Sequence, residues 1–169
     1  MSTNKFDVVV IGSGPGGYVC AIRLSQLGFK TAIIEKYNSL GGTCLNVGCI
    51  PSKSLLDSSH HYHDILKNAS NHGIEIDGEV KLDFNKMIDR KNNVVSQTVK
   101  GIDFLMDKNK ITVFNGLGSF IDSSSISVEG YDNPVYFDKC IIATGSKPIS
   151  LPFINIDKQR IITSTEALS

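Results

Sequence analysis

The chain has 169 residues, of which 41% are hydrophobic, and its equal numbers of acidic and basic side chains give a formal net charge of zero at pH 7. This size and composition fit one globular domain or part of a larger protein. The neutral balance provides no electrostatic footprint for nucleic acid or a charged membrane surface, and no apolar run is long enough to cross a bilayer. The N-terminus shows neither a signal-peptide pattern nor an Arg-rich transit segment, which predicts a cytoplasmic location.

Residues 6–36 have the pattern of a strand–helix–strand unit. Residues 6–12 (FDVVVIG) and 30–36 (KTAIIEK) are continuous apolar runs, which are typical of buried parallel strands. Residues 16–28 lie between them and carry apolar side chains at helical spacing. The order predicts a βαβ unit of the Rossmann type.

A glycine-rich loop, GSGPGG, joins the first strand to this helix. It matches G-x-G-x-x-G, in which Gly12 permits a tight turn, Gly14 lets the backbone approach a pyrophosphate, and Gly17 lets helix and strand pack closely. Glu35 ends the second strand, where a carboxylate can accept hydrogen bonds from an adenosine ribose. The unit is therefore expected to bind NAD or FAD.

The remainder of the chain predicts two helices followed by short strands. Residues 51–69 form one helical stretch, and Asp83 is a candidate N-cap for a long helix whose apolar stripe is expected to pack in the core. Residues 111–121, 124–130 and 134–145 have the period of strands, with a hairpin loop at 131–134. We therefore predict an α/β fold: a Rossmann-like βαβ domain with a parallel sheet and a small antiparallel β insertion.

Two cysteines, Cys44 and Cys49, lie five positions apart in GGTCLNVGCIPSK. On a regular helix their Cα atoms would be about 8–9 Å apart, too far for a disulfide. The thiols are therefore either unbonded, or the segment bends where it enters a helix. A redox pair, a zinc site and inert thiols all remain possible, although zinc would require two more ligands. Cys20 and Cys140 lie in predicted core elements, so no metal site is predicted.

At this point the sequence resembles a known family, the pyridine nucleotide–disulfide oxidoreductases, over its whole length. GGTCLNVGCIPSK resembles the redox-active motif of that family, GSGPGG with Glu35 resembles its FAD fingerprint, and IIATGSKP resembles its Ala-Thr-Gly segment. CLNVGCIPSK followed by two leucines is most similar to members that reoxidise dihydrolipoamide. A glutathione- or mercuric-reductase type and a flavin-binding module without turnover are the alternatives.

The resemblance implies a role for individual residues. Cys44 and Cys49 would form a redox disulfide, with Cys44 exchanging with the substrate and Cys49 facing the flavin. Lys53 would lie near the reactive edge of the flavin ring. The other residues expected to contact FAD are Gly12, Gly14, Gly17, Glu35, Gly42, Thr43, Gly118, Thr144 and Gly145.

The resemblance also implies what a complete member would contain. Residues 1–169 correspond to the N-terminal part of the FAD-binding domain, whereas the NAD-binding and C-terminal dimerisation domains of the family have no counterpart in this sequence. NAD would be the co-substrate of a full-length homodimer. Its partner would be the lipoyl domain of a dihydrolipoyl acyltransferase, or a glycine-cleavage lipoyl protein. By itself the 169-residue chain is expected to be inactive.

Overall fold

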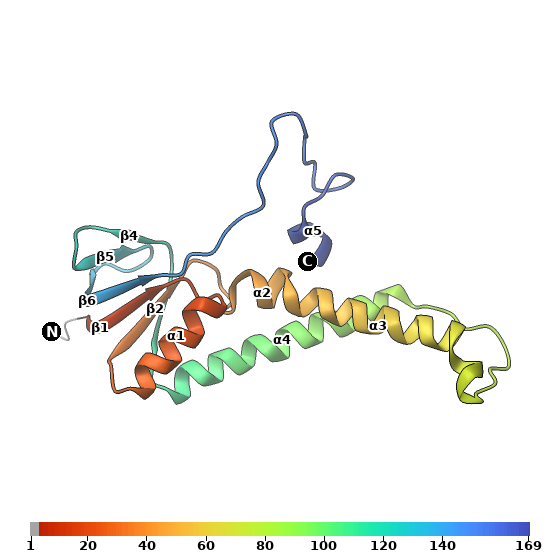
Figure 1. Ribbon diagram of the computed structural model, residues 1–169. Helices are drawn as coiled ribbons and strands as arrows, with labels where there is room; N and C mark the ends of the chain where they lie inside the picture. Colours follow the sequence, from red (N-terminus) through yellow and green to blue (C-terminus); the bar gives the residue numbers. More distant parts are fainter. Residues whose placement is uncertain (1–3) are drawn as a thin grey trace.

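A computed structural model describes residues 4–169, and its centre is a six-stranded sheet of order β3-β2-β1-β6-β5-β4 (Figure 1). The parallel part consists of β1 (Lys5–Ile11), β2 (Thr31–Glu35), β3 (Thr112–Asn115) and β6 (Val135–Ile142). Two short strands, β4 (Gly118–Phe120) and β5 (Ser125–Val128), extend the sheet by antiparallel pairing. The fold is therefore mixed α/β and mostly parallel, as predicted.

The helices lie to one side of the parallel strands (Figure 1). Helix α1 connects β1 to β2, as expected for a βαβ unit, and α2 and α3 follow β2 with a single residue between them. Helix α4 returns the chain to β3. The bounds are α1 (Pro15–Gln26), α2 (Gly42–Val47), α3 (Cys49–Lys67), the 3-10 helix η1 (Ala69–His72), α4 (Phe84–Lys108) and α5 (Ser164–Leu168).

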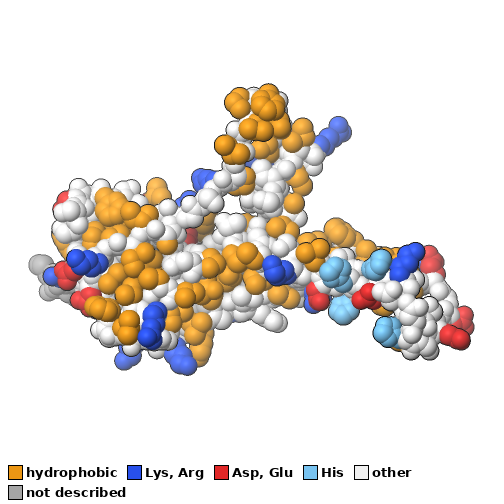
Figure 2. All heavy atoms as spheres, viewed as in Figure 1, with side chains coloured by type: hydrophobic (Ala, Val, Ile, Leu, Met, Phe, Trp, Pro, Cys, Tyr) orange, Lys and Arg blue, Asp and Glu red, His pale blue; other side chains and the backbone are white. Residues whose placement is uncertain are grey.

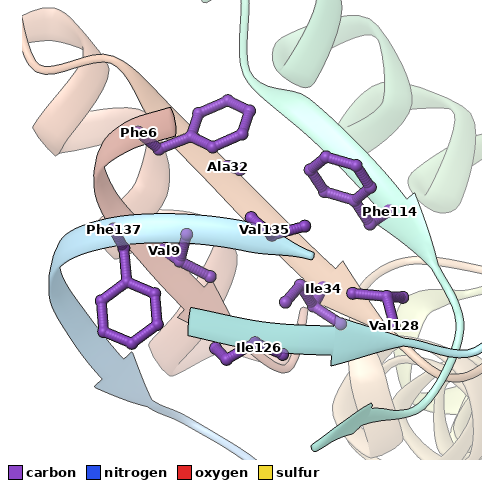
Figure 3. Close-up of a cluster of buried hydrophobic side chains, with 9 residues drawn as sticks. All are labelled: Phe6, Val9, Ala32, Ile34, Phe114, Ile126, Val128, Val135 and Phe137. Carbon is purple, nitrogen blue, oxygen red and sulfur yellow. The ribbon is translucent and has the colours of Figure 1, made fainter. Parts of the chain in front are cut away.

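Each face of the parallel sheet carries its own hydrophobic core. On one face, Val10 and Ile33 pack with Ala21 of α1 and Met106 of α4. On the other face, β5 and β6 curl across the sheet and bring aromatic and β-branched side chains over β1 and β2 (Figure 3). The members of this second cluster are Phe6, Val9, Ala32, Ile34, Phe114, Ile126, Val128, Val135 and Phe137. Burial on both faces explains why β1 and β2 are continuous apolar runs.

The prediction that residues 111–121 form one strand is wrong. This run is divided at Gly116 and Leu117 into β3, which pairs in parallel with β2, and β4, which pairs antiparallel with β5. The backbone N–H of Gly116 donates to the carbonyl of Glu35 at 2.8 Å, so the last bond to β2 is made where the chain turns away. A Cβ at Gly116 would collide with the carbonyl oxygen of Glu129. Only β4 and β5 thus correspond to the predicted insertion.

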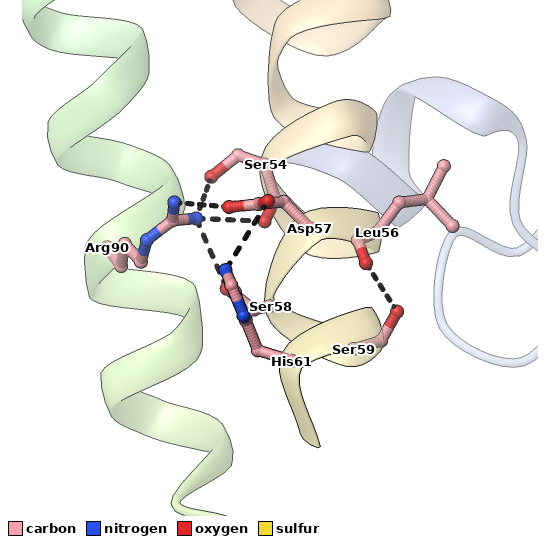
Figure 4. Close-up of polar contacts among 7 residues, drawn as sticks. All are labelled: Ser54, Leu56, Asp57, Ser58, Ser59, His61 and Arg90. Carbon is pink, nitrogen blue, oxygen red and sulfur yellow. Dashed lines mark hydrogen bonds and ion pairs between the residues drawn. The ribbon is translucent and has the colours of Figure 1, made fainter. Parts of the chain in front are cut away.

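Helices α3 and α4 form an antiparallel hairpin that extends away from the sheet (Figure 1). Arg90 of α4 holds the two helices together (Figure 4). Its guanidinium donates to the backbone oxygen and the Oγ of Ser54 at 3.0 Å each, and to Asp57 Oδ2 at 2.6 Å. Asp83 caps α4 as predicted, because its Oδ1 accepts a 3.1 Å hydrogen bond from the Lys86 N–H.

The apolar stripe of α4 contributes less to the core than we expected. Ile102 is buried, but Phe84, at the far end of the hairpin, is 61% exposed. The reason is that only the C-terminal part of α4 covers the sheet, as the core residues Ile102 and Met106 show. The remainder of α4 packs on α3, a helix exposed along most of its length.

Residues 146–163 run away from the sheet, and α5 then returns to α2 (Figure 1). The ammonium group of Lys91 on α4, a residue only 2% exposed, donates a 3.0 Å hydrogen bond to the backbone oxygen of Leu168 at the end of α5. This bond ties the C-terminal segment to the helical hairpin. Across residues 4–169, no helix is both long and apolar enough to span a membrane.

Candidate active site

A cleft of about 700 Å³ opens at the carboxyl ends of the parallel strands. Residues that directly follow β1, β2 and β6 line it, among them Gly12, Lys36 and Ala143. The first residues of α1 and α2 complete its wall. Open α/β sheets bind ligands at this position, and the volume is within the range of small-molecule and cofactor sites.

Close backbone contacts shape the glycine loop. Gly12 has φ +99°, which a side chain rarely adopts, and a Cβ there would collide with the carbonyl oxygen of Ala143 after β6. A Cβ at Gly17 would collide with the carbonyl oxygen of Gly12. Gly17 is buried beneath the loop and does not line the cleft, which agrees with the packing role expected for the third glycine.

Glu35 lies at the end of β2, is 5% exposed and lines the cleft. Its Oε2 accepts hydrogen bonds from the backbone N–H of Ser13 at 2.9 Å and from the Ser13 hydroxyl at 2.6 Å. Its Oε1 accepts from the backbone N–H of Tyr37 at 3.0 Å. The carboxylate is therefore held in one orientation by donors from the glycine loop and from the residues that follow β2.

The two cysteines lie on either side of a break between helices. Cys44 is in α2, Cys49 begins α3, and Gly48 between them has φ −146° and ψ −116°. The segment therefore bends where it enters a helix, so the spacing of a regular helix does not apply to the two thiols. A Cβ at Gly42 would lie 2.7 Å from the Cα of Gly14, so the start of α2, the helix that carries Cys44, packs directly on the glycine loop.

All four cysteines are free thiols in the described chain. The side-chain hydrogen bond with Cys49 is the main cause that raises the pKa of the Cys44 thiol above its ordinary value, and burial adds to it. The charge of Lys53 opposes this shift only in part. The partner thiol therefore outweighs the lysine in its effect on the pKa of Cys44.

The structure brings most of the predicted site residues to this one cleft. The exceptions are Gly17, buried under the loop, and Lys53, an exposed residue of α3. Those that line the cleft are Gly12, Gly14, Glu35, Gly42, Thr43, Cys44, Cys49, Gly118, Thr144 and Gly145. Their individual roles stay predictions, but their convergence from five separate segments is a fact of the fold.

Some residues that line the cleft were not predicted. Lys36 and Tyr37 follow Glu35 directly, and Leu117 precedes Gly118, so their proximity to predicted residues was the available signal. Ser13 is different, because it occupies a position where the glycine motif accepts any residue. No pattern in the sequence singles it out.

The histidines and the remaining cysteines do not form a second site. His60, His61 and His63 are exposed on the outer part of α3, and Figure 2 shows histidines among charged side chains on that arm of the molecule. In the described part of the chain, no three His, Cys, Asp or Glu residues lie close enough to hold a metal ion. Cys140 packs against a core cluster, and burial raises its pKa.

Comparison with known proteins gives the same picture over almost the whole chain. The chain is 51% identical to a mitochondrial dihydrolipoyl dehydrogenase of Pisum sativum, over 99% of its own length and 34% of the pea protein. It is 52% identical to a leghemoglobin reductase of Vigna unguiculata over 99% of its length and 32% of that protein. The chain thus spans about a third of the length of these relatives.

A solved structure shares the fold. The HOCl-induced flavoprotein disulfide reductase RclA from Escherichia coli superimposes with a TM-score of 0.78 and 29% sequence identity, covering 96% of this chain and 33% of that one. The family model described as pyridine nucleotide-disulphide oxidoreductase matches residues 6–169. This match includes the glycine loop, the acidic end of β2 and both cysteines of the cleft, and the chain belongs to the pyridine nucleotide–disulphide oxidoreductase family.

Proposed function

We propose that this chain is the FAD-binding and dithiol part of a dihydrolipoyl dehydrogenase, which oxidises dihydrolipoamide to lipoamide with NAD⁺ as the final acceptor. The observation that carries the proposal is that Cys44 and Cys49 line the same cleft as the glycine loop and Glu35. A dithiol and a dinucleotide fingerprint in one cleft are what electron transfer between a thiol pair and a flavin requires.

The cleft fits a dinucleotide. Gly14 and Gly145 line it, and a Cβ at either position would meet no atom within 4 Å, so the space in front of them is available to a ligand. Gly14 is also the N-cap of α1, which has no side-chain cap within the described residues. Pro15 has no N–H and Gly17 donates to the carbonyl of Gly14, so the N–H groups of Gly14 and Gly16 are the ones that would meet a pyrophosphate. Glu35 would hold the ribose, and Gly42, Thr43, Gly118 and Thr144 would contact the remainder of FAD.

The cysteine pair would perform the thiol half of the reaction. Starting from a Cys44–Cys49 disulfide, a thiolate of dihydrolipoamide attacks the sulfur of Cys44 and releases Cys49 as a thiolate. The second thiol of the substrate then attacks the substrate sulfur that is bonded to Cys44. This attack closes the lipoamide ring and releases Cys44 as a thiolate. The substrate loses two electrons and two protons, and the protein gains a dithiol. A bound flavin supplies the two-electron chemistry between this dithiol and nicotinamide.

The surroundings of such an enzyme belong to the same proposal. Its partner would be the lipoyl domain of a 2-oxo-acid dehydrogenase complex or a glycine-cleavage lipoyl protein, and the full-length protein would be a homodimer that binds NAD outside residues 1–169. A cytoplasmic location stays a prediction.

The test uses the full-length protein. We expect it to purify with FAD, to form NADH at 340 nm from NAD⁺ and dihydrolipoamide, and to lose this activity in Cys44→Ser and Cys49→Ser while keeping its flavin. Because a relative of equal similarity is named leghemoglobin reductase, NADH-dependent reduction of ferric leghemoglobin is measured on the same sample. Flavin without dihydrolipoamide oxidation, or activity that survives both cysteine changes, would contradict the proposal.

A further inference from the structure

Ser13 is a fully buried hydroxyl at the variable position of the glycine motif, with an exposed fraction of 0%. Its Oγ lies 2.6 Å from Glu35 Oε2 and 3.1 Å from the backbone nitrogen of Gly41. Gly41 is the residue that precedes α2, and Glu35 ends β2. One side chain therefore connects the glycine loop, the acidic end of β2 and the residue that precedes α2.

The direction of these hydrogen bonds follows from the chemistry of the partners. The Gly41 N–H can only donate, so it occupies a lone pair of the Ser13 hydroxyl. An ionised Glu35 carboxylate can only accept, so the hydroxyl proton of Ser13 must point to Oε2. Neither partner allows the hydroxyl to rotate away, and its orientation is fixed.

The carboxylate of Glu35 keeps a limited acceptor capacity. Two carboxylate oxygens offer about four lone-pair sites. Three are used by the Ser13 N–H, the Ser13 hydroxyl and the Tyr37 N–H. Because Glu35 lines the cleft, the acceptor that remains is available to a ligand there.

We propose that Ser13 is a positioning residue that determines the preference of this site for adenosine with free ribose hydroxyls. Its hydroxyl holds Glu35 so that the unused acceptor faces the ligand. This inference rests on the proposed function, because it concerns the adenosine end of the same cleft. Without the hydroxyl, Oε2 keeps only the Ser13 N–H as a donor and gains an unused acceptor, while Oε1 still accepts from the Tyr37 N–H. The unused acceptor is then no longer confined to one place on the carboxylate.

The change Ser13→Ala should leave the fold intact. The backbone of Ser13 makes its own bonds to the same partners, since its N–H donates to Glu35 at 2.9 Å and its carbonyl accepts from Gly41 at 3.0 Å. Ser39→Ala is the matched control. The Ser39 hydroxyl, in the neighbouring loop, donates to Asn46 Oδ1 at 2.9 Å and makes no hydrogen bond to Glu35 in the described structure.

The experiment measures binding of ADP, 2′-deoxy-ADP and 3′-deoxy-ADP by calorimetry to flavin-free full-length protein. In the unchanged protein and in Ser39→Ala, the deoxy-ADP that lacks the ribose hydroxyl donating to Glu35 should bind about 10- to 100-fold more weakly than ADP. In Ser13→Ala this ratio should fall by at least about threefold, because Glu35 is held by two donors instead of three and discriminates less between the nucleotides. If Ser13 acted only in folding, Ser13→Ala would weaken the binding of all three nucleotides equally and preserve the ratio of their affinities.

The outcomes separate this inference from the proposed function. An unchanged ratio in Ser13→Ala, with ADP still bound by the unchanged protein, would overturn the role of Ser13 alone. No binding of ADP or FAD to the unchanged protein would overturn the proposed function. If Ser13→Ala fails to fold, Ser13→Cys, of nearly the same size but with a weak donor, is measured in the same way and should give the same fall in ratio.

Discussion

Gly48 packs directly on the backbone of Cys44: a Cβ at position 48 would lie 3.2 Å from the Cα of Cys44 and 2.8 Å from the carbonyl oxygen of Thr43. Gly48 is also the single residue between α2 and α3. The approach of the two helix ends, and hence of Cys44 to Cys49, therefore depends on the absence of a side chain at this position.

Gly48→Ala should separate the cysteines and destabilise the protein. The new methyl group meets backbone atoms, which cannot move aside as a flexible side chain can, so we expect a cost of about 1–3 kcal/mol in the free energy of unfolding. Formation of the Cys44–Cys49 disulfide should also be slower than in the unchanged protein. Urea denaturation and thiol titration after timed air oxidation measure the two effects.

Gly101→Ala is the control for this change. Gly101 is exposed within α4, and a Cβ there would meet no atom within 4 Å. We expect it to raise stability by about 0.5–1 kcal/mol, because alanine favours the helix, and to leave disulfide formation unchanged. If Gly48→Ala and Gly101→Ala had the same effect on the free energy of unfolding and on disulfide formation, the contact between Gly48 and Cys44 would be unimportant.

Much of the site could be predicted because its residues depend on local backbone requirements. Gly12 and Gly17 stand where a Cβ would collide with backbone, and Glu35 ends a strand whose length the apolar run defines. Such requirements appear in the sequence as fixed residue types at fixed spacing. The spacing of the cysteines does not show whether the chain bends between them. The backbone conformation of Gly48 in the structure shows that it does.

Other features depend on long-range contacts that leave no local pattern. The division of residues 111–121 into β3 and β4 follows from pairing with two different partners, β2 and β5. Ser13 was missed because its importance lies in Glu35 and Gly41, residues distant in sequence. The periodicity of α4 shows that one of its faces is apolar, but it does not show how much of that face other residues cover.

Cys49→Ala should lower the pKa of Cys44 in the reduced protein. The hydrogen bond with Cys49 is the largest of the causes that raise this pKa, and it is lost in the variant. The thiolate of Cys44 should therefore form at lower pH, and the midpoint of the rate of Cys44 alkylation by iodoacetamide, followed by mass spectrometry, should move to lower pH. Burial remains as a cause that raises the pKa of Cys44, and the charge of Lys53 remains as a cause that lowers it.

The control for the thiol measurement is Cys140→Ala. Cys140 is on β6, packed against the core cluster on the face opposite the helices, and does not line the cleft. Its replacement should leave the midpoint for Cys44 unchanged. A midpoint that stays in place, or rises, in Cys49→Ala would mean that burial rather than the partner thiol determines the reactivity of Cys44.

Arg90→Lys should loosen the contact between α3 and α4 although the charge is kept. The planar guanidinium reaches the backbone oxygen of Ser54 and the carboxylate of Asp57 at once, which a single ammonium group cannot reproduce. We expect a loss of about 0.5–1.5 kcal/mol in urea denaturation.

The substitution Asp57→Asn tests the contribution of the Arg90–Asp57 ion pair independently of the hydrogen bonds from Arg90 to Ser54. Arg90 and Asp57 are about half exposed, so their ion pair should contribute less than about 1 kcal/mol. Asp57→Asn is therefore expected to cost less than Arg90→Lys. If Asp57→Asn cost more stability than Arg90→Lys, the ion pair would be the main source of the stability of the hairpin.

The last prediction concerns Lys91, which is 2% exposed and donates to the backbone oxygen of Leu168 at 3.0 Å. A buried ammonium group pays a desolvation cost of several kcal/mol, which one carbonyl offsets only in part. Lys91→Met keeps most of the volume and removes the charge, so it should be neutral or stabilising by up to about 2 kcal/mol. Lys91→Ala leaves a cavity under α5 and should cost about 2–4 kcal/mol.

Urea denaturation gives both values for Lys91, with Lys100→Met, at an exposed position of the same helix, as the control for general effects of the substitution. Hydrogen exchange at the amides of α5 shows whether the helix stays attached. If Lys91→Met is as damaging as Lys91→Ala and releases α5, then the hydrogen bond to Leu168, rather than the volume of the side chain, holds the C-terminal segment on α4. If α5 remains protected in Lys91→Met and exchanges freely in Lys91→Ala, packing is what holds it, and the ammonium group is a net cost to stability.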